Sequence, residues 1–243
     1  LTLRRGRREV LRDVSLTVAR GDFLAVVGPN GAGKTSLVQA IAGLLRVPRG
    51  TVAADPVGFV FQNPEHQFVR HSVADELAFG LRGRPEAEVT ARVDAMLATL
   101  GLTGLRDAHP FLLSGGQKRR LSVGTALIAG APLLVLDEPT FGQDRARAAE
   151  LLGMLARLNA DGTTVVIVTH DLGLAAEYAS HVAIVADGRL AAHGRTADIL
   201  SDGDLLAANG LRRPALATAL SAPEVPAPLR GITRLRDLPG GAA

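Results

Sequence analysis

Short apolar runs alternate along most of the chain with segments in which apolar residues recur three or four positions apart. Four of these runs are predicted to be strands: 23–27 (FLAVV), 57–61 (VGFVF), 133–136 (LLVL) and 164–168 (TVVIV). Helical spacing follows the first run over residues 36–45. Nearly continuous apolar strands that alternate with helices are typical of a parallel sheet covered on both faces. The pattern therefore predicts an α/β fold.

The region between the second and third predicted strands has a helical pattern. Ser72, with Asp75 three residues later, predicts a helix N-cap. Pro85 stands where a helix-initiating proline is expected. Residues from about 63 to 132 are therefore expected to form a helical subdomain inserted in the core.

The pattern changes towards the C-terminal end of the chain. Residues 182–194 contain two short apolar runs on either side of Asp187 and Gly188, which predicts a hairpin. From Asp204 the composition becomes rich in Ala, Leu and Pro. We expect one domain over residues 1–203, followed by a peripheral tail over 204–243 that is helical in part and disordered in its last twenty residues.

Composition narrows the class of protein. The 243 residues are 47% apolar and carry a net charge of +3, which is a globular composition and excludes disorder over the whole length. The absence of cysteine excludes disulfides and thiolate metal sites. No apolar stretch reaches the roughly 20 residues of a spanning helix. Arginine dominates the basic residues, which we interpret as a solvated surface, so no nucleic-acid partner is expected.

Residues 28–35 (GPNGAGKT) match the phosphate-loop pattern GxxxxGK[ST]. Such a loop points successive backbone N–H groups at phosphate oxygens, and the helix that follows adds its partial positive charge. A plain glycine turn is the simpler alternative, but the strand before and the helix after disfavour it. The candidate nucleotide-binding residues are Gly28, Pro29, Asn30, Gly31, Ala32, Gly33, Lys34, Thr35 and Ser36, with Lys34 directed at the β and γ phosphates and the Thr35 hydroxyl at Mg²⁺.

Two carboxylates, Asp137 and Glu138, end the predicted strand 133–136. At the carboxyl end of a core strand they are expected to face the phosphates. Asp137 is then suited to hold Mg²⁺ through water, and Glu138 to polarise an attacking water. A solvated Asp-Glu turn would be the simpler interpretation in isolation. The phosphate loop earlier in the chain favours the catalytic one.

A second glycine-containing helix start occurs at 113–117 (LSGGQ). Ser114 is suited to cap the helix, and glycines at its start leave amides open to a phosphate. Ser114, Gly115, Gly116 and Gln117 are therefore candidate nucleotide-binding residues. Because the chain has only one phosphate loop, this second helix start is expected to serve the nucleotide of another molecule. Lys118, the next residue, is expected to face solvent.

In order and spacing, these motifs resemble the ATP-binding subunit of an ABC transporter, over about residues 1–203. The phosphate loop is similar to Walker A, LLVLDE to Walker B, and LSGGQ to the signature sequence. Three further residues complete the resemblance. Gln62 in FVFQNPEHQF is similar to the Q-loop glutamine, Asp144 in TFGQD to the D-loop aspartate, and His170 in VTHD to the switch histidine.

The resemblance implies a P-loop NTPase (RecA-like) core with a mostly parallel sheet, an N-terminal antiparallel β subdomain and an ABC-type α-helical subdomain. Two ATP molecules would lie between two such domains, each held by Walker A of one and the signature of the other, with Asp144 near the nucleotide. Glu138, His170 and Gln62 are the implied catalytic residues. Thr35, Gln62 and Asp137 are the implied Mg²⁺ ligands.

Finer resemblance indicates a subfamily. Residues 59–68, 72–81 and 194–216 are similar to the ATPases of energy-coupling factor importers, which take up vitamins and transition-metal ions. The implied partners are membrane-embedded transporter subunits and a second ABC ATPase domain, which is identical, different or fused. The implied location is peripheral, at the cytoplasmic face of the cell membrane. Asp75 or Glu76 is expected either to meet a basic coupling helix or to be an exposed N-terminal carboxylate.

Two features depart from the family pattern. The opening strand begins in its middle at Leu1, which favours a domain cut from a longer polypeptide. Arg5 stands where family members stack an aromatic residue on adenine, so poor discrimination between ATP and GTP is expected. The alternative function is a soluble ABC ATPase that acts on ribosomes or another macromolecule. Chromosome-acting members are disfavoured because no sustained heptads lie between Gln62 and Ser114.

Overall fold

The computed structural model describes residues 1–6, 8–220, 224–226, 229, 232, 234, 237 and 238. The chain divides into two compact units, one made of residues 1–53 with 166–243 and the other of residues 54–165. Along the chain, the second boundary falls inside strand β6 (Thr164–Val168), which is the strand predicted at these positions. The disorder expected in the last twenty residues concerns mostly positions outside the described ranges.

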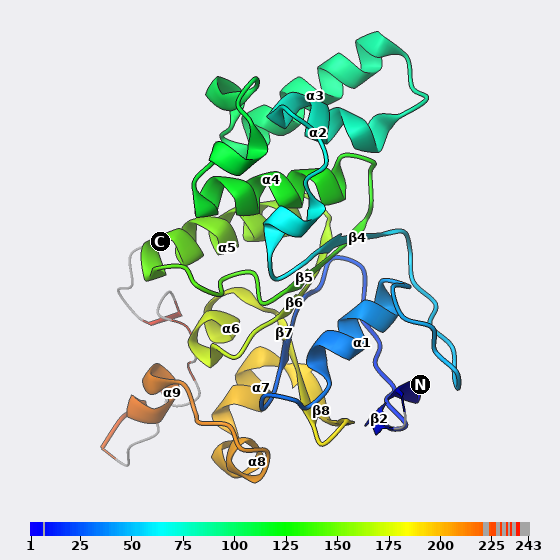
Figure 1. The fold of residues 1–243 in the computed structure, drawn as a ribbon. Helices are drawn as coiled ribbons and strands as arrows, with labels where there is room; N and C mark the ends of the chain where they lie inside the picture. The colour runs from blue at the N-terminus through cyan, green and yellow to red at the C-terminus, as the bar shows by residue number, and fades with distance from the viewer. Residues whose placement is uncertain are drawn as a thin grey trace. The chain divides into compact units, whose positions relative to one another are not determined.

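The first unit contains an antiparallel pair and a set of core strands (Figure 1). The pair is β1 (Leu3–Arg5) with β2 (Arg8–Leu11). The core strand β3 (Phe23–Val27) is buried at every position and pairs in parallel with β7 (His181–Ala186). Strand β8 (Arg189–Arg195) runs antiparallel to β7. The prediction of strand 23–27 from its apolar run is confirmed.

Among the helices of the first unit, the one whose bounds were predicted is shorter than expected. Helix α1 spans Lys34–Ile41, so it begins two residues before the predicted range 36–45 and ends four residues before its end. Gly43, with φ 70°, follows the helix in the left-handed conformation that ends helices. The others are α6 (Leu172–Tyr178), α7 (Thr196–Ser201), α8 (Gly203–Ala208) and α9 (Ala215–Ala219).

The predicted hairpin about Asp187 and Gly188 is confirmed, and its tip contacts two other parts of the first unit. Both turn residues have positive φ, 46° and 74°, as a two-residue hairpin turn requires. The Gly188 N–H donates to the carbonyl of Ala32 at 3.1 Å, and the Arg12 N–H donates to the carbonyl of Gly188 at 2.7 Å. The hairpin tip is therefore bonded both to the phosphate loop and to the segment after β2.

The second unit pairs two parallel strands and contains four α-helices. Strand β4 (Val57–Val60) lies beside β5 (Leu133–Asp137), with Val60 opposite Leu136. The helices are α2 (Val73–Ala78), α3 (Glu86–Leu100), α4 (Gly115–Leu127) and α5 (Arg145–Ala160), with 3₁₀ turns at 64–67, 79–81, 103–105 and 110–112. Ser72 caps α2 as predicted, whereas Pro85 is the N-cap of α3 rather than its first helical residue.

Two glycines allow helix α4 to pack closely on its neighbours in the second unit. A Cβ on Gly124 would lie 2.4 Å from Leu100 of α3 and 3.0 Å from Leu77 of α2. A Cβ on Gly58 of β4 would lie 2.4 Å from the backbone carbonyl oxygen of Ala126. Figure 1 shows α2 and α3 against α4. Helix α4, which begins at the LSGGQ sequence, is thereby held on the strand that leads to Gln62.

Candidate functional site

The phosphate loop folds around the ammonium group of Lys34. This side chain is 7% exposed, and its Nζ donates to the carbonyl oxygens of Gly28 at 2.8 Å and Pro29 at 2.9 Å. Helix α1 starts at Lys34 with Gly33 as N-cap, and no side chain caps its first N–H groups. A helix start that no side chain caps, with a cation beside it, is an arrangement suited to binding an anion.

Glycine is required at both ends of this loop by close approaches within the first unit. Gly28 has φ 148°, and a Cβ there would lie 2.0 Å from the carbonyl oxygen of Val185 in β7. Gly33 has φ 105°, and its Cβ would lie 2.8 Å from the carbonyl oxygen of Val10 in β2. These contacts fix where the loop leaves β3 and where it enters α1.

His170 lies in the same unit as the phosphate loop, in the loop after β6. The preceding Thr169 N–H donates to the carbonyl of Val26 in β3 at 3.1 Å. The following Asp171 caps α6 by accepting from the N–H groups of Gly173 and Leu174. His170 itself is exposed. Bonds on both sides therefore hold this histidine near the end of the strand from which the phosphate loop starts.

Arg5 bonds to a polar side chain of helix α1. Its Nη2 donates to Gln39 Oε1 at 2.6 Å, and the arginine is exposed at the end of β1. The side chain is thereby linked to the helix that begins in the phosphate loop. Its expected place beside a nucleotide base stays a prediction.

In the second unit, Asp137 and Glu138 follow β5. Asp137 is buried at the strand end, whereas Glu138 is half-buried and has φ 47°. A left-handed backbone in a residue other than glycine costs of order 1–3 kcal/mol and persists where the surroundings enforce it. Here the Glu138 carbonyl accepts from the Phe141 N–H at 3.1 Å in the following turn. The two successive carboxylates therefore stand where the strand ends and the turn begins.

The LSGGQ sequence forms the start of α4 with a reciprocal cap. The Gln117 N–H donates to Ser114 Oγ, and the Ser114 N–H donates to Gln117 Oε1 at 2.8 Å. A Cβ on Gly115 or Gly116 would meet no atom within 4 Å, and neither glycine has a positive φ. Nothing in the described chain therefore requires glycine at these two positions, and the space beside them is open.

Gln62 and Asp144 also lie in the second unit, and both are exposed. Gln62 lies between β4 and Asn63, which caps the 3₁₀ turn Pro64–Gln67. Asp144 caps α5 by accepting from the Arg147 N–H at 3.0 Å, and it also pairs with the Arg147 side chain. Its carboxylate is therefore engaged by its own helix, and its expected role near nucleotide stays a prediction.

One expectation about the charged residues of the second unit is wrong, and another is narrowed to one of its two residues. Lys118 does not face solvent, because its side chain is only 14% exposed and its Nζ forms an ion pair with Glu65 Oε1 at 2.5 Å. Glu76 is 4% exposed, and its Oε2 accepts from the N–H groups of Val69 and Arg70. Glu76 is therefore neither an exposed carboxylate nor available to a partner helix. Asp75 is exposed and accepts from Ser72 Oγ.

Arg119 is a buried charge that the sequence pattern did not single out. It is 4% exposed in α4, and its Nη1 donates to the carbonyl of Phe61 at 2.9 Å. Burial lowers the pKa of this guanidinium from its ordinary value to about 10. The only signal in the sequence is a second basic residue directly after Lys118, which is also typical of a solvated helix face.

Neither a resident metal cluster nor a membrane span is found in the part of the chain that the structure describes. Within that part, no three His, Asp or Glu side chains gather where they could hold a metal ion. Its helices are all too short or too polar to span a bilayer.

The sequence pattern of the ABC transporter family matches residues 11–141, more than half of the chain. The chain belongs to the ABC transporter family. Among its relatives, the cobalt import ATP-binding protein CbiO of Rhodobacter capsulatus is 40% identical, with 96% of this chain and 90% of that protein covered. The energy-coupling factor transporter ATP-binding protein EcfA1 of Lacticaseibacillus paracasei is 39% identical, with 86% of this chain and 81% of that protein covered.

A solved structure supports the same family assignment. That of cbiO1 from Clostridium perfringens, part of the ABC transporter complex cbiONQ, has a TM-score of 0.78 and 28% identity, over 91% of this chain and 96% of that one. The expected α/β P-loop NTPase fold, with mostly parallel strands, an antiparallel β pair and a helical part, is confirmed for this ABC protein. The chain spans only 39% and 36% of the lengths of two longer curated relatives.

Proposed function

We propose that this ABC protein is the ATP-binding and ATP-hydrolysing subunit that powers an energy-coupling factor type importer for a vitamin or a metal ion. The likeness to CbiO and EcfA1 over most of the length of each supports the importer class. The chain would act as a peripheral protein at the cytoplasmic face of the cell membrane. Its membrane-embedded partners would select the transported substrate.

The observation that carries the proposal is the phosphate loop around Lys34. Its buried ammonium, held by two backbone carbonyls, lies beside α1 N–H groups that no side chain caps. A triphosphate offers these donors charged acceptors, and hydrogen bonds to charged groups are the stronger ones. In the proposed reaction Glu138 accepts the proton of the attacking water, and His170 contacts the terminal phosphate.

The proposed metal cofactor is Mg²⁺, which would arrive with the nucleotide. Its ligands would be the hydroxyl of Thr35, the amide oxygen of Gln62 and, through water, the carboxylate of Asp137. These are the hard oxygen donors that Mg²⁺ prefers, so the donor set fits this ion. When bound, the ion neutralises negative charge on the phosphates.

The second anion-binding helix start supports a partner domain. Gly115 and Gly116 leave open space that the described chain does not use, as expected if the nucleotide of a second ABC ATPase domain approaches there. We propose that this chain pairs with such a domain, identical, different or fused. The exposed Phe141, next to the Asp144 turn, is available to that partner.

Purification of the tagged chain from membranes of its own cells, with identification of the proteins that accompany it, tests this function. We expect membrane-embedded subunits and a second ABC ATPase, and Mg²⁺-dependent ATP hydrolysis by the recovered complex. Recovery of ribosomal proteins without any membrane protein would contradict the importer proposal and favour the soluble alternative.

A further inference from the structure

Two consecutive basic residues of helix α4 bind the segment that contains Gln62. Lys118 pairs with Glu65, and Arg119 donates to the carbonyl of Phe61. The two contacts lie on either side of Gln62, at positions 61 and 65. All of these residues belong to the second unit, so the contacts lie within one compact body.

The contact to Phe61 acts directly on the backbone of Gln62. The carbonyl of Phe61 and the N–H of Gln62 belong to one planar peptide unit, so a bond that fixes the carbonyl also fixes the orientation of that N–H. Arg119 is buried, and among the described residues no carboxylate lies within ion-pair distance of it. A buried cation costs free energy unless it is compensated, so a neutral side chain would be preferred here if packing alone were required.

Other contacts fix the two ends of the Gln62 segment. Gln67 Nε2 donates to the carbonyl of Phe59 at 2.9 Å, which closes the segment into a loop. Glu76 accepts from the N–H groups of Val69 and Arg70 where the segment ends. Asn63 caps the turn at 64–67 by accepting from the Glu65 N–H, and the bridge from α4 adds contacts to this segment from another element.

The other end of the bridge is the LSGGQ sequence. Ser114 and Gln117 form the reciprocal cap that sets the first turn of α4, and Lys118 and Arg119 follow in the next turn. A displacement of this helix start by a ligand at Gly115 and Gly116 would therefore move both anchoring side chains together.

We propose that Lys118 and Arg119 are positioning residues, which hold the Gln62 peptide at a set place relative to the LSGGQ helix start. Through these two side chains a movement of the helix start is transmitted to the Gln62 peptide, and a movement of the peptide to the helix start. The proposal rests on the proposed ATPase function, because it assigns Gln62 to the site of hydrolysis. It adds a link inside one chain between two parts that would serve different nucleotides. The LSGGQ sequence would serve the nucleotide bound by the partner domain, and Gln62 would serve the nucleotide bound by this chain.

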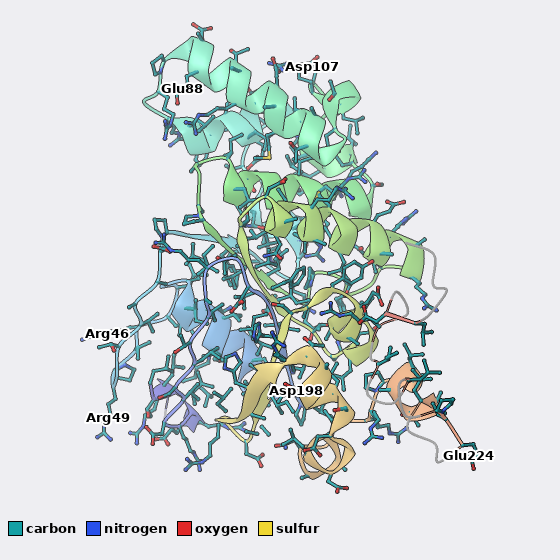
Figure 2. All side chains as sticks on the ribbon, turned by 180° about the vertical axis from the view of Figure 1, so that it is seen from behind. Arg46, Arg49, Glu88, Asp107, Asp198 and Glu224 are labelled. Carbon is teal, nitrogen blue, oxygen red and sulfur yellow. The ribbon has the colours of Figure 1, made fainter. Side chains whose placement is uncertain are left out.

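The test reverses and then restores the ion pair. The full chain, in the complex that accompanies it, is prepared as Lys118→Glu, as Glu65→Lys and as the double exchange. The matched control is Arg92→Glu, which breaks an exposed pair with Glu88 on α3 (Figure 2 shows Glu88 near the start of that helix). Arg119→Met is added to remove the donor to Phe61 at similar side-chain length.

Two measurements are made on each variant. Amide hydrogen exchange over residues 61–65 reports the order of the Gln62 segment, and steady-state hydrolysis of Mg·ATP reports kcat and KM. We expect each single reversal to speed exchange over 61–65 about tenfold and to lower kcat about tenfold with KM within about twofold. The double variant Lys118→Glu/Glu65→Lys should restore the wild-type rate of hydrogen exchange and the wild-type kcat. Arg92→Glu should change neither of them.

Exchange and kcat equal to wild type in the single reversals and in a folded Arg119→Met would overturn the proposal. Faster hydrogen exchange in the single variants that the double variant Lys118→Glu/Glu65→Lys does not return to the wild-type rate would also overturn it. If the wild-type complex does not hydrolyse ATP, the proposed function fails. The exchange over 61–65 still decides whether the bridge positions the segment, so the two failures are distinguishable.

Discussion

A Cβ atom placed on Gly28 would lie 2.0 Å from the carbonyl oxygen of Val185, a distance that no real pair of such atoms adopts. The first glycine of the phosphate loop is therefore required by strand β7 as well as by its φ of 148°. The signature glycines differ, since a Cβ on Gly115 or Gly116 would meet nothing. At position 28 the fold of this chain itself requires glycine. At positions 115 and 116 it does not, and glycine there leaves space beside the helix start.

Gly28→Ala should destabilise the fold, whereas Gly116→Ala should not. The first substitution forces a backbone clash and a strained φ, and we expect a loss of more than about 2 kcal/mol in the free energy of unfolding. The second places alanine in an open helix position, where it gains about 0.5–1 kcal/mol over glycine. Thermal unfolding measures both. We also expect Gly116→Ala to lose turnover in the assembled complex, and full turnover would contradict a close approach of nucleotide there.

Lys34→Ala should weaken ATP binding at least tenfold, because a hydrogen bond to a charged group contributes about 1.5–3 kcal/mol. Arg46→Ala is the matched control, since Arg46 also follows β3 in sequence but projects away from the ribbon (Figure 2). Titration with a fluorescent ATP analogue and Mg²⁺ compares the two. Equal losses of affinity would show that Lys34 acts only through overall charge.

Glu138→Gln should keep ATP binding and lose about 10²–10⁴ in turnover, because an amide cannot accept the proton of the attacking water. Glu138→Gly tests the backbone separately. Glycine adopts the left-handed conformation without strain, so this variant should unfold at a higher temperature than Glu138→Gln while remaining inactive. Turnover of the Gln variant near that of the wild type would remove Glu138 from the proposed role.

The stability of the first unit should fall at acid pH through His193. Burial lowers the pKa of this histidine from its ordinary 6.5, nearby His181 lowers it further, and Asp22 opposes the shift. Because the folded pKa lies below the unfolded one, the contribution is present above pH 6.5 and is lost as pH falls through the folded pKa. His193→Gln should flatten the dependence of melting temperature on pH below 6.5. An unchanged dependence would assign the acid sensitivity to other groups.

Arg5→Tyr should tighten ATP several-fold if residue 5 lies beside the base, since stacking contributes about 1–3 kcal/mol per base. Arg4→Tyr is the neighbouring control in the same strand, where Arg4 pairs with Glu9. We expect the wild type to bind ATP and GTP with similar affinity. Strong preference for ATP in the wild type, unchanged by Arg5→Tyr, would place the base elsewhere.

The strands were predictable from the sequence because burial on both faces leaves an unambiguous apolar run. Strands β3 and β6 have the predicted bounds, and β4 and β5 differ by one residue at an end. Helix ends were less predictable. The apolar spacing continues to Leu45, but Gly43 ends α1 before it, and the run after Ser72 changes from α-helix to a 3₁₀ turn at Phe79.

Charged positions were the hardest part of the candidate site to predict. Lys118, Arg119 and Glu76 have the polar character of a solvated helix face, yet all three are largely buried. Their partners are the backbone at positions 61, 69 and 70, and the side chain of Glu65. Local spacing carries no information about such contacts, because they depend on which loop the folded chain brings to the helix.

The bond between Gly188 and Ala32 has a practical consequence for protein engineering. Hairpin tips are usually the first choice for inserting a tag, a fluorescent reporter or a protease site. Here the tip is bonded to the phosphate loop, so an insertion at 187–188 would disturb nucleotide binding although it lies more than 150 residues away in sequence. Gly83, in the turn before α3, has open space around it and a positive φ. That turn is the better insertion point for labelling the second unit while leaving the phosphate loop intact.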